Sequence, residues 1–217
     1  IKEIAWIHNN NNSFNVSTKE ALQADYTFVI LRNPFKRLLS FFLDKLCYIN
    51  NYKIDESNLK ACRTFDFSEE LSFCDFIDYI WQNPDKIFDD EHTSPQCEFL
   101  LYRKYDDYFA LEQMEDANNE IFNKTGMIVE DIRDNNSIFT SKGRQSNTQI
   151  NYHMKSRDIA EYLANNNIPL ADNMFSTEMI QKTSALYLQD ILLYCNVIKD
   201  GMSEMNDWIQ KAIADYS

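Results

Sequence analysis

Glycine is scarce in this chain, and its scarcity excludes one common kind of phosphate site. Only three of the 217 residues are glycine, and the first of them is Gly126. A glycine-rich phosphate loop surrounds its anion with backbone amides and needs several glycines close together. No such loop is therefore present anywhere before Arg32.

Long apolar runs are also missing. Nothing approaches 18 consecutive apolar residues, and the first residues lack the basic-then-apolar order of a secretory signal. The 44% hydrophobic and 14% aromatic content is nevertheless that of a globular chain, and 217 residues suffice for a substantial core. We expect one soluble domain over residues 1–217, without stable insertion into a membrane.

The cysteines form no C-x-x-C pair and show no metal-ligand spacing. There are five of them, an odd number, dispersed as Cys47, Cys62, Cys74, Cys97 and Cys195. This usage is typical of reduced core thiols in a cytoplasmic protein. The alternative is the Golgi lumen, if a membrane anchor precedes these residues. We expect no metal ion.

Basic residues are few. The chain has 21 Lys and Arg against 34 Asp and Glu, a formal net charge of −13. Proteins that bind nucleic acids or sulfated polysaccharides usually display a basic cleft. The sequence therefore argues against a nucleic-acid partner and against a polyanionic substrate.

Residues 26–46 are the most informative stretch. Tyr26–Leu31 is a short apolar run rich in aromatic and β-branched residues, which predicts a buried strand. Arg32-Asn33 forms a polar turn, and Pro34 stands where proline is best tolerated, at the first position of a helix. Apolar residues then recur at helical spacing, as Phe35, Leu38, Leu39, Phe42, Leu43, Leu46 and Ile49.

Charged and hydroxyl side chains gather at this predicted turn. Ligands of open α/β sheets bind beyond the carboxyl ends of the strands, and Arg32 lies at that end. Ser40 follows eight residues later, and Arg37 precedes Ser40 by one turn on roughly the same face. Arginine and a hydroxyl that converge on one spot suit a phosphate monoester. The alternative is an ordinary strand–helix turn with a surface arginine.

The nonapeptide from Arg32 to Ser40 resembles a known signature, R-[DN]-P-x-x-R-x-x-S. Sulfotransferases that use 3′-phosphoadenosine 5′-phosphosulfate (PAPS) carry it after a strand. The resemblance implies that Arg32 and Ser40 bind the 3′-phosphate of this nucleotide co-substrate, with Arg37 beside them.

Four other places are similar to the carbohydrate-type and bacterial members of this family, in the same order along the chain. His92 to Gln96 resembles an H-x-x-P-Q segment, Tyr108 to Gln113 a strand followed by glutamate, and Leu186-Tyr187-x-x-Asp190 a late helix motif. His8 lies 24 residues before Arg32, about where relatives have their catalytic base. The resemblance therefore implies His8 as the general base.

Two further candidates have weaker support. His92 lies in a polar loop and is expected to line the acceptor pocket; the alternative is a structural hydrogen bond. Lys142 and Arg144, which flank Gly143, are similar to a late segment that clamps the 3′-phosphate in cytosolic sulfotransferases; the alternative is a solvated loop.

The family's phosphosulfate loop, P-K-x-[GA]-x-[ST]-[ST], has no match in these residues. We expect that this loop and its strand precede the sequence, because a sheet without its central strand would have an open apolar edge. The alternative is a relative that has lost the loop. The lysine that activates the donor therefore cannot be named.

The predicted fold is α/β, a small parallel sheet flanked by many helices, similar to the P-loop-NTPase-like sulfotransferase fold. Further strands are expected at residues 1–8 and 108–111, and a loop at 50–63; residues 135–151 are polar. Six more helices are predicted from capping residues and helical spacing: 17–24, from 72 to just before Pro84, 115–125, 157–163, 176–194 and 203–216.

Two functions from different classes remain open. The first is a PAPS-dependent sulfotransferase that acts on a hydroxyl of a small molecule, lipid or neutral glycan. The second is a catalytically inactive nucleotide-binding or protein-interaction domain with the same fold.

Overall fold

The computed structural model describes residues 23–47, 56–127 and 145–214. The predicted strand at 1–8 and the predicted helix at 17–24 lie outside these ranges, apart from the last two residues of the helix, which are not helical.

The predicted strand before Arg32 is present and is paired. Strand β1 (Phe28–Leu31) runs parallel to β2 (Asp107–Ala110), with Ile30 opposite Phe109. Both strands were predicted from their apolar runs, and parallel pairing brings their carboxyl ends to the same edge. The side chains that follow β1 and those that follow β2 therefore meet there.

A second parallel pair joins β3 (Gln145–Asn147) to β4 (Asn167–Pro169), with α8 (Ser156–Ala164) between them. Neither strand was predicted: residues 135–151 were described only as polar, and no strand was assigned at 167–169. Both strands have three residues, and Gln145 and Ser146 are exposed. Segments this short and polar carry no alternating pattern from which a strand could be recognised.

The helix after the Arg32 turn begins as predicted but does not continue as a regular α-helix. Helix α3 (Pro34–Phe41) is capped by Asn33, whose side chain accepts hydrogen bonds from the backbone amides of Phe35 and Lys36. A π-helical turn (Phe42–Leu46) follows it, closed by a hydrogen bond from the amide of Cys47 to the carbonyl of Phe42. The prediction of one α-helix through residue 49 is corrected accordingly.

The other helices are α4 (Glu56–Thr64), α5 (Phe73–Gln82), α6 (Met114–Thr125), α9 (Thr177–Leu186), α10 (Leu188–Val197) and α11 (Gly201–Ala214). Shorter 3₁₀ segments cover Pro84–Asp89, Gln96–Phe99, Leu111–Gln113 and Ala171–Asn173. The predicted caps at Ser72 and Ser176 are confirmed, and Gly126 ends α6 with a left-handed φ of 71°.

Three predictions of helical structure need correction. The predicted loop 50–63 contains α4, which is stabilised by packing: Ala61 is fully buried, and Phe65 contacts the Phe41 ring edge-on. The predicted helix 176–194 is two helices, broken at the buried Tyr187, whose hydroxyl bonds the carbonyl of Thr93. The last helix begins at Gly201, so Ser203 lies inside it rather than at its cap.

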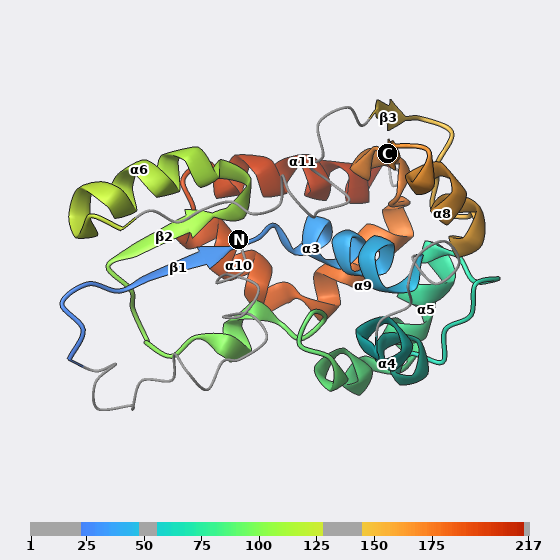
Figure 1. Ribbon diagram of the computed structural model, residues 1–217, viewed down its shortest axis with the longest axis horizontal. Helices are drawn as coiled ribbons and strands as arrows, with labels where there is room; N and C mark the ends of the chain where they lie inside the picture. Colours follow the sequence, from blue (N-terminus) through green and yellow to red (C-terminus); the bar gives the residue numbers. More distant parts are fainter. Residues whose placement is uncertain (1–22, 48–55, 128–144, 215–217) are drawn as a thin grey trace.

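Figure 1 shows β1 running into α3 at the centre of the molecule, with α11 alongside and α4 and α5 beyond. Aromatic rings fill the space between them. Phe35 of α3 stacks on Trp208 of α11 at 4.7 Å between ring centroids, and Phe42 packs on Phe73 at 4.9 Å. Burial of each such ring stabilises the fold by about 1.5–3 kcal/mol. The core therefore fixes the helix that follows Arg32 against the C-terminal helix.

The architecture is the predicted α/β class, with a small parallel sheet and a large helical share. No helix in the described part of the chain has both the length and the apolar character needed to cross a membrane.

Candidate functional site

A cavity of about 420 Å³ lies at the carboxyl end of β1. Four of the residues predicted from the sequence line it together: Arg32, Arg37, Ser40 and His92. The remaining lining residues are Ile30, Phe41, Asp44, Lys45, Gln96 and Leu111. Segments from β1, α3, the π-helical turn and the loop before residue 96 thus converge on one hollow.

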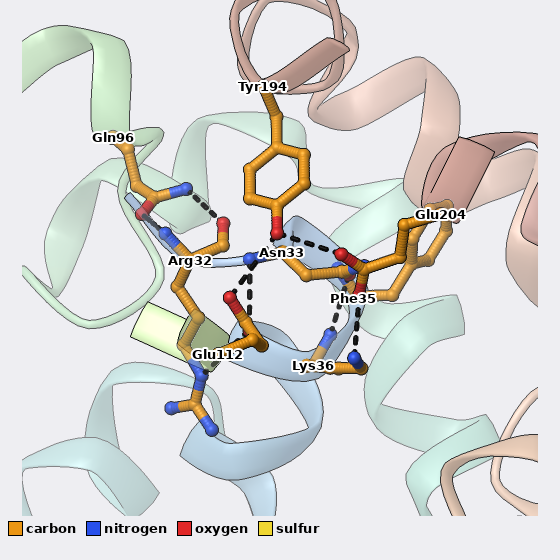
Figure 2. Close-up of polar contacts among 8 residues, drawn as sticks. All are labelled: Arg32, Asn33, Phe35, Lys36, Gln96, Glu112, Tyr194 and Glu204. Carbon is orange, nitrogen blue, oxygen red and sulfur yellow. Dashed lines mark hydrogen bonds and ion pairs between the residues drawn. The ribbon is translucent and has the colours of Figure 1, made fainter. Parts of the chain in front are cut away.

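The backbone of Arg32 is held by a pair of hydrogen bonds to one side chain. Its amide donates to Gln96 Oε1 and its carbonyl accepts from Gln96 Nε2, both at 2.8 Å (Figure 2). The side-chain amide of Gln96 thus both accepts from and donates to the backbone of Arg32, as the backbone of a neighbouring strand would. Gln96 belongs to the H-x-x-P-Q segment, but nothing in the sequence indicated this partner.

The loop that carries His92 is held in turn by the junction of α9 and α10. The Tyr187 hydroxyl donates to the carbonyl of Thr93 at 2.7 Å. The buried carboxylate of Asp190 accepts from the amides of Gln96 at 2.7 Å and Cys97 at 2.9 Å. The segments His92–Gln96 and Leu186–Asp190, which both resemble motifs of the family, are therefore in contact. The hydrogen bonds from the later segment fix the backbone of the earlier one.

Asn33 is fully buried, and its side-chain oxygen, side-chain nitrogen and backbone amide all form hydrogen bonds. Its Oδ1 caps α3, and its backbone amide donates to Glu112 Oε1 at 3.2 Å. Its Nδ2 donates to Glu204 Oε1 at 2.9 Å. Each of these bonds satisfies a polar group that would be costly to bury alone.

Glu204 connects this turn to the C-terminal helix. Its Oε1 also accepts from Lys36 Nζ at 2.6 Å, and its Oε2 accepts from the Tyr194 hydroxyl at 2.8 Å. Burial raises the pKa of the Glu204 carboxyl, but hydrogen bonds from Lys36, Tyr194 and Asn33 outweigh it and leave this pKa below its ordinary value. Burial, with Glu112 and Glu204 close by, raises the pKa of Tyr194. Sequence reasoning identified neither Tyr194 nor Glu204.

The Arg32 side chain is 28% exposed, and its Nε lies 4.0 Å from Glu112 Oε1. Figure 2 shows its guanidinium pointing away from Tyr194 and Glu204. Ser40 is half-buried on α3 and lines the same cavity as Arg32. The cavity thus holds a guanidinium and a hydroxyl, the pair suited to an anion with several oxygens.

Arg37 has a different environment from Arg32. One terminal nitrogen donates to the carbonyl of Ser94 at 2.6 Å, and the other donates to the carbonyl of Glu91 at 2.9 Å. Burial lowers the pKa of Arg37, against opposing effects of Tyr187, Asp190 and Asp90. Arg37 lines the cavity, and these two bonds commit one donor of each terminal nitrogen to the His92 loop.

The His92 side chain is 43% exposed, and its Nε2 lies 3.8 Å from Glu91 Oε1. Its ring faces Phe41 at 6.4 Å between centroids. Burial lowers the pKa of His92; Lys45 adds to this effect, whereas Asp90, Glu91 and Asp44 oppose it. A lowered pKa favours the neutral imidazole at neutral pH, the form that accepts a proton.

His8, Lys142 and Arg144 lie outside the described residues. Their predicted roles stay predictions. Within 23–47, 56–127 and 145–214, no three His, Cys, Asp or Glu side chains are grouped to hold a metal ion.

A parallel strand that runs through the Arg32 turn into a helix, with a cavity beyond it, is the place where open α/β proteins bind their ligands. Comparison with known families makes this specific: the sequence model of the Sulfotransferase family matches residues 2–195. The chain belongs to the sulfotransferase family, whose reaction class is sulfuryl transfer. Neither the curated proteins nor the solved structures include a match to this chain.

The bonds of Arg37 predict a structural effect for its removal. Arg37→Ala should lower the free energy of unfolding by about 2–3 kcal/mol, because two charge-assisted hydrogen bonds to loop carbonyls are lost. Denaturant unfolding measures this difference. Arg103→Ala, at an exposed position, should change stability by no more than about 0.5 kcal/mol. If Arg37→Ala were as stable as wild type, the two hydrogen bonds of Arg37 would not anchor the His92 loop, and this structural role would be contradicted.

Proposed function

We propose that this protein is a PAPS-dependent sulfotransferase, in which Arg32 and Ser40 bind the 3′-phosphate of the donor. The observation that carries the proposal is that both residues line one cavity at the carboxyl end of β1, in a chain of the sulfotransferase family. A 3′-phosphate presents several oxygens, and a guanidinium with a hydroxyl offers donors for more than one of them.

The turn itself supports this choice. Gln96 fixes the backbone of Arg32 on both sides, and Asn33 fixes the start of α3. A backbone held in this way does not have to be ordered when the ligand arrives, so less conformational entropy is lost on binding. Arg37 contributes to the site by holding the His92 loop, and Lys142 and Arg144 are proposed as a second clamp on the same phosphate.

The transfer is an in-line displacement at sulfur, which needs a base for the acceptor hydroxyl and cationic groups for the departing phosphate. We assign the base to His8. His92 lines the cavity with a lowered pKa and is proposed to contact the acceptor. Among the described residues the cavity has the basic groups Arg32, Arg37 and Lys45.

The acceptor is proposed to be a small molecule, a lipid or a neutral glycan. The net charge of −13 gives a mean field that repels anions, so the donor must be held by a local basic site. Asp44 on the cavity wall is paired with Lys45 at 3.1 Å, which offsets one of the cations of that site. A polyanionic acceptor would have to approach against the mean field.

The second candidate function is a nucleotide-binding or protein-interaction domain that does not catalyse transfer. A labelled-sulfate transfer assay separates the two, because a domain of this second kind binds adenosine 3′,5′-bisphosphate but transfers no sulfate from PAPS.

Loss of Arg32 should weaken nucleotide binding. In Arg32→Ala, the affinity for adenosine 3′,5′-bisphosphate should fall by roughly ten- to hundredfold, because a contact of about 1.5–3 kcal/mol is lost. Calorimetry measures this, and Arg103→Ala, at an exposed position outside the cavity lining, is the control. Ser40→Ala should cause a smaller loss of the same kind. Equal affinity in wild type and Arg32→Ala would rule out the assignment.

The negative net charge of the protein predicts which class of acceptor it uses. Neutral alcohols, phenols and neutral glycans should accept labelled sulfate from PAPS more efficiently than heparin-like or chondroitin-like chains, because the protein's field opposes anions. A transfer screen over both classes at one ionic strength is the measurement. Selective transfer to the polyanions would refute this part of the proposal.

The two histidines should differ in their kinetic effects. His8→Ala should lower kcat by about 10²–10⁴-fold, the usual contribution of a general base, with almost no change in affinity for adenosine 3′,5′-bisphosphate. His92→Ala should mainly raise KM for the acceptor. The reverse pattern, with the large loss of kcat in His92→Ala, would move the role of base to His92.

A further inference from the structure

Glu204 contacts the Arg32 turn from a distant part of the chain. It lies in the first turn of α11, 171 residues after Asn33, and outside the residues that match the family. Its two carboxylate oxygens accept three hydrogen bonds, from Asn33, Lys36 and Tyr194 (Figure 2). Two of these donors belong to the segment that carries Arg32.

The bond to Asn33 fixes which way its side-chain amide faces. The amide oxygen must point to the start of α3, where it accepts from Phe35 and Lys36, and the amide nitrogen then faces Glu204. A negatively charged acceptor favours this orientation, since a reversed amide would turn its oxygen toward the carboxylate. Because Asn33 follows Arg32 directly, the orientation that caps α3 also determines the backbone from which Arg32 projects.

The bond to Lys36 separates the cations of the turn. Lys36 Nζ is held at 2.6 Å by Glu204, and Lys36 is not among the residues that line the cavity. Arg32 lines the cavity instead, and Figure 2 shows the two side chains leaving the turn in different directions. Glu204 therefore holds Lys36 away from the cavity, whereas Arg32, whose Nε lies 4.0 Å from Glu112 Oε1, lines it.

We propose that Glu204 is a positioning residue for the phosphate site: it holds Asn33 and Lys36 so that Arg32 is presented to a 3′-phosphate. This inference rests on the proposed function. Glu204 acts through Asn33 and Lys36, and no contact of its own with the ligand is required.

Helix α11 has other attachments, so the role of Glu204 can be separated from the docking of the helix. Trp208 stacks on Phe35, and Lys211 forms an ion pair with Asp172 and accepts a hydrogen bond at its carbonyl from Thr177. Asp172→Ala removes an anchor of α11 away from the Arg32 turn, and it is the matched control for Glu204→Ala.

Hydrogen exchange of the full chain without ligand tests the positioning itself. In Glu204→Ala, the amides of Phe35 and Lys36 should exchange about fivefold faster, because the cap on α3 is weakened. Glu204→Gln keeps a neutral acceptor of the same shape and should restore most of the protection. Asp172→Ala should leave both amides unchanged. Unchanged exchange in Glu204→Ala would overturn the inference.

Calorimetry with two nucleotides tests the consequence. Glu204→Ala should weaken binding of adenosine 3′,5′-bisphosphate by about five- to twentyfold and leave binding of adenosine 5′-phosphate unchanged. Glu204→Gln should fall between Glu204→Ala and wild type, and Asp172→Ala should match wild type. A general loss of stability would weaken both nucleotides alike and would overturn the inference, as would an undiminished preference for the 3′-phosphate in Glu204→Ala. If wild type itself shows no preference for the 3′-phosphate, the proposed function fails, and the exchange experiment still decides whether Glu204 holds the turn.

Discussion

The buried side-chain amide of Asn33 is the constraint on which the rest of this site depends. A fully buried amide must satisfy both its oxygen and its nitrogen, and each partner comes from a different element. The oxygen caps α3, the nitrogen requires the carboxylate of α11, and the adjacent backbone amide requires Glu112 beyond β2. One residue thus brings the strand pair, the helix after Arg32 and the C-terminal helix to a common point.

The same arrangement recurs around the cavity. Side chains hold backbone groups of other segments: Gln96 binds the backbone of Arg32, Arg37 binds the carbonyls of Ser94 and Glu91, and Asp190 binds the amide of Gln96. Backbone atoms held in this way cannot move without breaking these bonds, three of which are partly shielded from water. Irregular loops can therefore form a defined wall with few strands behind it.

The parts that could be predicted from sequence are those set by local chemistry. An apolar run, a polar turn and a proline define β1 and the start of α3. The spacing of eight residues between Arg32 and Ser40 lets both side chains line the same cavity. Long-range partners had no such signal, because the bond from Asn33 to Glu204 depends on how α11 packs. Helix α4 was missed for a related reason, since a polar segment became helical by packing Ala61 and Phe65 into the aromatic core.

The π-helical turn at Phe42–Leu46 makes this segment sensitive to the exact number of its residues. Such a turn holds one residue more than an α-helical turn. Shortening it by a single residue would give a regular helix, and every later side chain would rotate by about 100° around the axis. Asp44 and Lys45 would then leave the rim of the cavity, and Leu46 would leave the core. Variants that differ in length here would alter the mouth of the site while the sequence from Arg32 to Ser40 stays intact.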